Sequence, residues 1–190
     1  ISACLVGSEM CIRDSDDTEV LAEGSIEAML EHSQREEVGA VGAKLLFPNN
    51  TIQHAGVVIG LFDSCEHVHK FTPRNEIGYY GSLIATRNYS AVTAACTMIP
   101  RRVFQEVGGF DERLAVVFND IDLCLRIRSL GYLIVYTPYA VFYHHEHASR
   151  RGMLPLHPAE EDTLFKERWK ELILKGCLLY TSDAADEEDS

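Results

Sequence analysis

Basic residues are scarce in this sequence, and their scarcity excludes one large class of function. The 190 residues include 17 Lys and Arg against 29 Asp and Glu, a formal net charge of -12. A nucleic-acid-binding protein needs a basic surface that neutralises phosphates. We therefore expect no nucleic acid among the partners of this chain.

Long apolar runs are absent as well. No stretch of the sequence approaches the roughly 20 apolar residues that a transmembrane helix needs. The chain is nevertheless long enough to bury the core of one domain. We therefore expect no membrane span within these 190 residues.

The two ends of the chain differ from the rest in their origin. Residues 10–15 (MCIRDS) can be encoded by a DNA element whose opposite strand encodes residues 177–181 (CLLYT). This element resembles a transposase adaptor of sequencing libraries, present once in each orientation. We interpret residues 1–15 and 176–190 as adaptor-derived and residues 16–175 as natural protein. The alternative is a natural leader and a natural acidic tail.

Removing the two ends changes the bulk composition. Residues 16–175 carry a formal net charge of -6, and their cysteines are Cys65, Cys96 and Cys124. Three widely spaced cysteines give neither a disulfide framework nor a zinc site. Such usage is typical of a reducing compartment, so we expect a cytoplasmic protein.

Helical and strand-like patterns alternate along the natural part of the chain. Apolar residues at helical spacing predict helices, and short β-rich apolar runs predict strands. The expected helices cover residues 25–34, 100–107, 120–130 and 158–174, and the expected strands cover residues 38–47, 52–59, 91–99, 132–136 and 140–143. This alternation predicts an α/β fold with a mixed central sheet. Residues 60–86 are expected to form a long loop with a functional role.

Adjacent acidic and imidazole side chains suggest a metal site. Asp16 and Asp17 are neighbouring carboxylates without a basic neighbour, which a divalent cation would neutralise. His144 and His145 follow a strand, and a neutral imidazole is a good ligand for manganese. The alternatives are a turn or helix cap for the acids and solvated or capping histidines.

A second acidic group lies at the start of a predicted helix, over Asn119-Asp120-Ile121-Asp122. Helix capping by Asn119 or Asp120, with acids in the first turn, would account for the group on its own. A carboxylate in this position could also act as a general base. Asp122 can instead pair with Arg126 one turn later.

Several short motifs together resemble the C-terminal half of family 2 glycosyltransferases, in particular the rhamnosyltransferase-like enzymes that extend bacterial surface polysaccharides. The motifs are Gly108-Gly109-Phe110-Asp111, Asn119-Asp120-Ile121-Asp122-Leu123-Cys124-Leu125-Arg126, Tyr143-His144-His145 with Ser149, and Thr51-Ile52-Gln53-His54-Ala55-Gly56. The resemblance implies part of a glycosyltransferase A fold, whose nucleotide-binding half would precede Asp16 and be missing. The chain alone is then expected to be inactive.

The resemblance also implies roles for individual residues. The expected reaction is inverting transfer of a sugar from a nucleotide-diphosphate donor to a hydroxyl of a saccharide or lipid-linked saccharide, with Asp120 as the base. The metal, Mg²⁺ or Mn²⁺, would contact Asp17, Asp16 and His144, with His145 as the second choice among the histidines. Substrate contacts are expected from Asp111, Asp122, Thr93, Ala94 and Arg126, and acceptor contacts from Phe71, Tyr79, Tyr80 and Arg87. Gln53 and His54 are expected only to tie a hairpin together.

Two other classes of function stay open at this point. A non-catalytic carbohydrate-binding relic would keep the core but would not need Asp120. A metal-dependent hydrolase would use the same acids and histidines without an acceptor sugar. For the enzyme, the expected location is the cytoplasm, at the inner face of the cell membrane through peripheral association.

Overall fold

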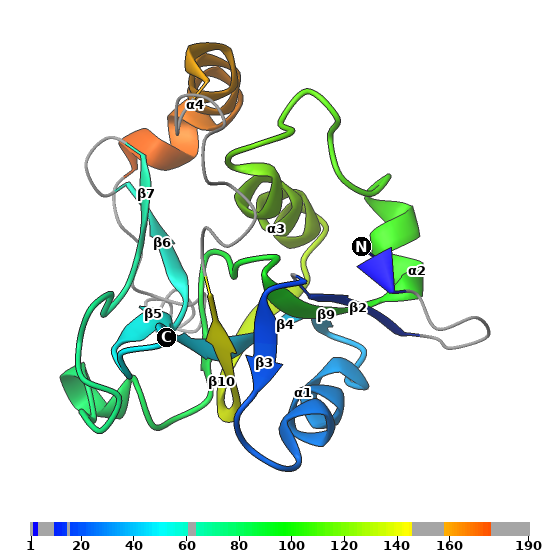
Figure 1. The fold of residues 1–190 in the computed structure, drawn as a ribbon. Helices are drawn as coiled ribbons and strands as arrows, with labels where there is room; N and C mark the ends of the chain where they lie inside the picture. The colour runs from blue at the N-terminus through cyan, green and yellow to red at the C-terminus, as the bar shows by residue number, and fades with distance from the viewer. Residues whose placement is uncertain (1, 4–9, 15, 61–63, 146–157, 176–190) are drawn as a thin grey trace, which may run out of the picture.

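A mixed β-sheet forms the centre of the molecule. The computed structural model describes residues 2–3, 10–14, 16–60, 64–145 and 158–175, and in these ranges eight strands pair into one sheet. The order is β1-β2-β9-β4-β10-β3, with β5 on β4 and β8 on β10 (Figure 1). The strands are β1 (Ser2–Ala3), β2 (Met10–Asp14), β3 (Thr18–Val20), β4 (Val38–Leu46), β5 (Ile52–His54), β8 (Arg87–Asn88), β9 (Cys96–Pro100) and β10 (Leu133–His144).

The sheet is mixed because β4 and β10 run parallel while the other pairs are antiparallel. All nine residues of β4 are buried, as expected for a central strand covered on both faces. Two further strands, β6 (Val57–Ile59) and β7 (Cys65–His67), pair with each other beside the main sheet. The α/β fold with a mixed central sheet is confirmed.

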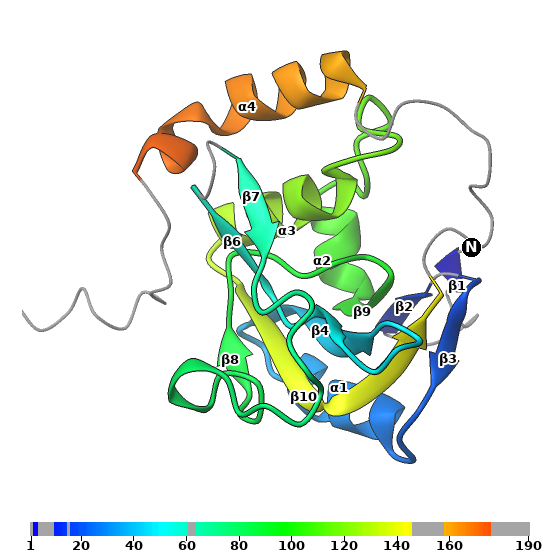
Figure 2. The same ribbon diagram turned by 60° about the vertical axis from the view of Figure 1, so that its left-hand side comes forward.

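Helices cover both faces of the sheet. The helices are α1 (Ser25–Ser33), α2 (Arg101–Glu106), α3 (Asn119–Ser129) and α4 (Ala159–Leu174), with a short 3-10 helix η2 (Tyr79–Gly81). Helix α1 packs on β4, β9 and β10 from one side, and α3 packs on β4 and β10 from the other. Helix α4 lies outside α3, on the side away from the sheet (Figures 1 and 2). None of these helices is both long and apolar enough to cross a bilayer, within the ranges that the structure describes.

Small residues in β4 allow other segments to approach its backbone closely. A Cβ atom at Gly42 would lie 2.5 Å from the Cβ of Val92, and one at Gly39 would collide with Ile127. Val92 therefore lies directly on β4, and Thr93 and Ala94 follow it in the chain.

Three local predictions need correction. The two strands expected over 132–136 and 140–143 form one strand, β10 (Leu133–His144), with an irregularity between Thr137 and Val141. The strand expected over 52–59 divides into β5 and β6, because Gly56 has a φ of 111° that extended backbone cannot adopt. Ser25 does not cap α1: its hydroxyl accepts the N–H of Val141 and donates to the carbonyl of Ala22.

Strand β2 lies in the segment that we interpret as adaptor-derived. Its backbone pairs with β9 from Met10↔Pro100 to Asp14↔Cys96. Backbone pairing needs no particular side chains, so the presence of this strand does not decide whether residues 1–15 are adaptor-derived or natural. That interpretation stays a prediction.

Helix α4 should contribute strongly to stability through one aromatic residue. Phe165 is fully buried and its ring stacks on Phe118, with centroids 4.4 Å apart and an interplanar angle of 11°. We expect Phe165→Ala to lower the free energy of unfolding by about 3–5 kcal/mol. The matched change Leu174→Ala, at a residue 73% exposed on the same helix, should cost at most about 0.5 kcal/mol. Equal losses in urea unfolding would show that α4 is not packed through Phe165.

Candidate active site

An aspartate and a histidine meet at one end of the central strands. The Nε2 atom of His144 lies 3.1 Å from Oδ1 of Asp17, and both side chains are mostly buried. The strand register produces this pair, because His144 at the end of β10 lies opposite Thr18 of β3, and Asp17 precedes Thr18. A backbone hydrogen bond from His145 N–H to the Asp17 carbonyl closes the same end.

The other ring nitrogen of His144 contacts a buried glutamine. Its Nδ1 lies 2.7 Å from Oε1 of Gln53, whose residue is 5% exposed. His145 points elsewhere and lies 3.4 Å from a carboxylate oxygen of Glu19. The structure thus directs His144, and not His145, toward Asp17.

The geometry of this pair suits two neighbouring ligands of one ion. Ligands at right angles around an octahedral ion, each about 2.1 Å from it, are about 3 Å apart. No group of three or more His, Cys, Asp or Glu side chains able to hold an ion occurs in the described ranges. Asp16 is exposed and lies in the turn before β3. His147 and Ser149 lie outside the described residues.

His54 follows Gln53 in the sequence and connects the Asp17–His144 pair to the backbone beside Asp120. It is completely buried, and burial, with the nearby His67 and His144, lowers its pKa well below the usual value. Its Nε2 accepts the N–H of Thr93 at 3.4 Å, so Nδ1 carries the proton and faces Nδ1 of His67 at 2.9 Å. A neutral His54 therefore holds the backbone at Thr93.

Asp120 lies beside that backbone. Its Oδ2 accepts the N–H of Ala94 at 3.1 Å, and its Oδ1 accepts the N–H of Ile121 at 2.9 Å. It occupies the first turn of α3, which begins after Phe118 in a left-handed conformation (φ 60°) and has no side-chain cap. Asp120 therefore does more than serve the start of α3, because its carboxylate also accepts a hydrogen bond from the segment that contains Ala94.

These contacts form one unbroken series from the Asp17–His144 pair to Asp120. The series runs from His144 to Gln53, through the adjacent His54 to Thr93, and through the adjacent Ala94 to Asp120. Segments that are far apart in the sequence are thereby joined in one region. Asp17 and His144 are in direct contact, whereas Asp120 is linked to them only through Gln53, His54, Thr93 and Ala94, and its role as the base stays a prediction.

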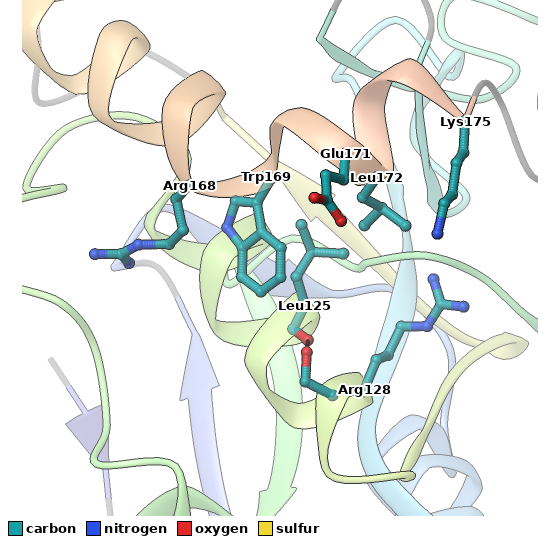
Figure 3. Close-up of a pocket in the computed structure, with 8 residues that line it drawn as sticks. Leu125, Arg128, Arg168, Trp169, Glu171, Leu172 and Lys175 are labelled. Atoms are coloured by element: carbon teal, nitrogen blue, oxygen red, sulfur yellow. Dashed lines mark hydrogen bonds between the residues drawn. The ribbon is translucent and has the colours of Figure 1, made fainter.

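A second acidic cluster binds α4 to α3. Asp122 is fully buried and accepts hydrogen bonds from Arg126 Nε (2.8 Å), Arg168 Nη1 (2.7 Å) and Trp169 Nε1 (3.0 Å). Arg168 also donates to Asp111 at 2.7 Å. Figure 3 shows Arg168 and Trp169 extending from α4 toward α3. The sequence placed Trp169 on the apolar face of this helix but did not predict its contact with Asp122, and it did not single out Arg168.

Helix α4 also holds the loop that leads into Asp120. Oε2 of Glu161 accepts the N–H groups of Val116 and Val117 at 3.0 and 2.8 Å. With the Phe165–Phe118 stack, this contact fixes the chain immediately before α3. Glu161 was not foreseen, because an acid in the first turn of a helix usually serves the helix dipole.

The expected substrate-binding residues are mostly engaged within the protein. Asp122 is enclosed, and Arg126 donates to Asp122 and to the carbonyls of Val107 and Gly109. Ala94 uses its N–H for Asp120, and the side chain of Asp111 is 15% exposed. Contact of these residues with a substrate stays a prediction, and the enclosure of Asp122 favours a positioning role.

A cavity of about 420 Å³ lies between α3 and α4 (Figure 3). Its lining residues are Leu125, Arg128, Ser129, Arg168, Trp169, Glu171, Leu172 and Lys175. Leu125, Arg128 and Ser129 belong to the second half of α3 and the others belong to the C-terminal part of α4 and Lys175 after it, whereas Asp120 lies in the first turn of α3. The cavity is therefore separate from the Asp17–His144–Asp120 region.

Comparisons with known proteins agree with this architecture. Residues 11–168 match the model of the glycosyltransferase like family 2, and the chain belongs to that family. It is 42% identical over 145 residues to the O-antigen biosynthesis protein RfbC of Myxococcus xanthus. The aligned residues make up 76% of this chain and 11% of that protein. It is 31% identical over 131 residues to the N-acetylglucosaminyl-diphospho-decaprenol L-rhamnosyltransferase of Mycobacterium tuberculosis, covering 65% of this chain and 43% of that enzyme.

A solved structure shows the same fold at low sequence identity. The crystal structure of GalNAc-T7 with UDP, GalNAc and Mn²⁺ aligns over 94% of this chain and 40% of that chain, with a TM-score of 0.56 and 15% identity. The fold is that of the glycosyltransferase A class. This chain thus spans only a part of the length of each protein that it resembles.

The Asp111 cluster predicts how stability depends on pH. Hydrogen bonds from Arg113 and then Arg168 hold the pKa of Asp111 far below its usual value in the folded protein. In the unfolded chain the Asp111 carboxylate takes up a proton at about pH 4. Its contribution to the free energy of unfolding is therefore present above that pH and is lost as the pH falls below it. Asp111→Asn should therefore make the fall of unfolding free energy between about pH 4 and 2 less steep.

The control for this measurement is Asp16→Asn, at an exposed carboxylate in the turn before β3. Denaturant unfolding at a series of pH values measures the slope for each variant. An unchanged slope in Asp111→Asn would contradict the assignment of this ion pair.

Proposed function

We propose that the whole protein transfers a sugar, with inversion, from a nucleotide-diphosphate donor to a hydroxyl of a saccharide or lipid-linked saccharide in cell-surface polysaccharide synthesis. The observation that carries the proposal is the series of contacts joining the Asp17–His144 pair to Asp120. Membership of the glycosyltransferase family supports the class of reaction. The proposal concerns the whole protein, and we expect residues 1–190 alone to be inactive.

Asp120 is the base in this proposal. Backbone N–H groups hold both of its oxygens, and no Lys or Arg pairs with it in the described part of the chain. Each carboxylate oxygen has further acceptor capacity and can take the proton of an attacking hydroxyl. The contact with Ala94 fixes the direction in which the carboxylate faces.

Asp17 and His144 are the residues that would hold Mg²⁺ or Mn²⁺, while the other two candidates, Asp16 and His145, are exposed in the turn before β3 and directed toward Glu19, respectively. Two acceptor atoms 3.1 Å apart need a proton or a cation between them, and the spacing suits neighbouring ligands of one ion. Oxygens of the donor diphosphate and water would complete the coordination. When bound, the ion offsets the negative charge that develops on the leaving diphosphate.

Names of the relatives support the substrate class. One relative acts on a decaprenol-linked N-acetylglucosaminyl diphosphate as an L-rhamnosyltransferase, and another takes part in O-antigen biosynthesis. We propose sugar contacts from Asp111, Thr93 and Ala94 near the base, and a location at the cytoplasmic face of the cell membrane. The exposed Phe71, Tyr79 and Tyr80 offer aromatic faces for acceptor sugars.

Changing the proposed base tests the reaction directly. Asp120→Asn keeps the hydrogen-bond acceptor toward Ala94 but cannot take up the proton. We expect transfer by the whole protein to fall by about 10²–10⁴-fold while donor binding is retained. The matched control Asp162→Asn, at a surface carboxylate on α4 that pairs with Lys166, should leave transfer unchanged. A carbohydrate-binding relic without catalysis would respond to neither change.

Removing the metal tests the other half of the site. Chelation with EDTA should abolish transfer, and Mn²⁺ or Mg²⁺ should restore it. His144→Ala should weaken activation by the metal more than His145→Ala, because His144 faces Asp17 and His145 faces Glu19. Transfer that persists in thoroughly chelated protein would exclude this role for the pair.

A further inference from the structure

Gln53 has an unusual position at the edge of the sheet. In the pairing of β5 with β4, Leu45 lies opposite His54 and Leu46 lies opposite Ile52. One step along β4 therefore matches two steps along β5, and Gln53 is the extra residue of a bulge. Bulges of this kind redirect a side chain and are common beside active sites.

The bulge directs the Gln53 side chain to His144. Ile52 and His54 on either side are completely buried, and Gln53 itself is 5% exposed, so its amide lies within the protein. Its Oε1 lies 2.7 Å from Nδ1 of His144, a full hydrogen bond between residues 91 positions apart. A hairpin tie would not need this contact, because the backbone already pairs β5 with β4.

The identity of the contacting atom determines the form of the imidazole. An amide oxygen only accepts hydrogen bonds, so with Oε1 of Gln53 facing it, Nδ1 of His144 is assigned as the protonated donor. The Nε2 atom can then present its lone pair to an ion that Asp17 Oδ1, 3.1 Å away, also binds, while without an ion a proton must lie between the two atoms. The opposite tautomer would place the proton on Nε2 and block coordination there.

We infer that Gln53 is a positioning residue that holds His144 with the proton on Nδ1 and with Nε2 free to bind the ion beside Asp17. The inference rests on the proposed function, in which His144 and Asp17 hold a divalent ion. A partner that orients a metal-binding histidine through its second nitrogen raises metal affinity.

The neighbouring contacts separate this role from the base. His54 follows Gln53 and reaches Thr93, which leads to Asp120 through Ala94. The described side-chain contact of Gln53 is with His144, on the metal side of the site. A change of Gln53 should thus alter metal binding before it alters the environment of Asp120.

Binding of Mn²⁺ to the whole protein, followed by electron paramagnetic resonance, tests the inference. Gln53→Leu, which removes the acceptor, should weaken Mn²⁺ binding by about 10–100-fold. Gln53→Glu keeps an acceptor oxygen and should restore most of the affinity. The matched control Gln34→Leu, at an exposed residue after α1, should have no effect.

A second readout does not depend on the metal. Long-range ¹H–¹⁵N spectra of the imidazole, assigned by comparison with His144→Asn, report whether Nδ1 carries a proton. We expect a proton on Nδ1 in the unmodified protein and in Gln53→Glu, and its partial loss in Gln53→Leu. Unchanged Mn²⁺ affinity in Gln53→Leu, or a bare Nδ1 in the unmodified protein, would overturn the inference.

The two readouts distinguish failure of this inference from failure of the proposed function. If the unmodified protein binds no Mn²⁺, the metal part of the proposed function fails, and the spectra still decide whether Gln53 sets the tautomer. If Gln53 controls Mn²⁺ affinity but Asp120→Asn transfers sugar normally, the inference stands and the assignment of the base fails.

Discussion

The site depends on the pairing of β10 along both of its edges. One edge pairs in parallel with β4, and the other pairs with β8 and then with β3. This register places His144 opposite Thr18, and so beside Asp17. A slip of one residue would turn His144 to the opposite face of the sheet. Backbone hydrogen bonds, more than attraction between the side chains, therefore determine the geometry of the pair.

The second half of the site depends on α4, which is distant from it in the sequence. Glu161 binds the loop before α3, and Arg168 joins Asp111 to the buried Asp122. A buried carboxylate is costly unless it is paired and hydrogen-bonded, and Asp122 is both. Helix α4 thus holds the start of α3, where Asp120 faces Ala94. Strand β10 therefore positions the proposed metal ligands Asp17 and His144, and helix α4 positions the proposed base Asp120.

Sequence patterns predicted the elements well and the contacts between them poorly. Helix α3 was predictable because its apolar residues repeat at helical spacing, and β4 because its run is apolar with small residues. Periodicity says nothing of contacts between distant segments, such as Arg168 with Asp111 or Gln53 with His144. The bulge at Gln53 depends on strand register, which one strand's sequence does not contain. Residues of the site came from motif resemblance, and their partners came from the fold, except for Arg126, which the helical spacing already paired with Asp122.

A crystal structure of the whole protein with Mn²⁺ and an unreactive nucleotide-sugar donor would test the central claim most directly. We expect an anomalous manganese peak within about 2.0–2.3 Å of Asp17 Oδ1 and His144 Nε2. We also expect Asp120 to face the anomeric carbon from the side opposite the diphosphate. A manganese ion bound away from Asp17 and His144, or a sugar held out of reach of Asp120, would contradict it.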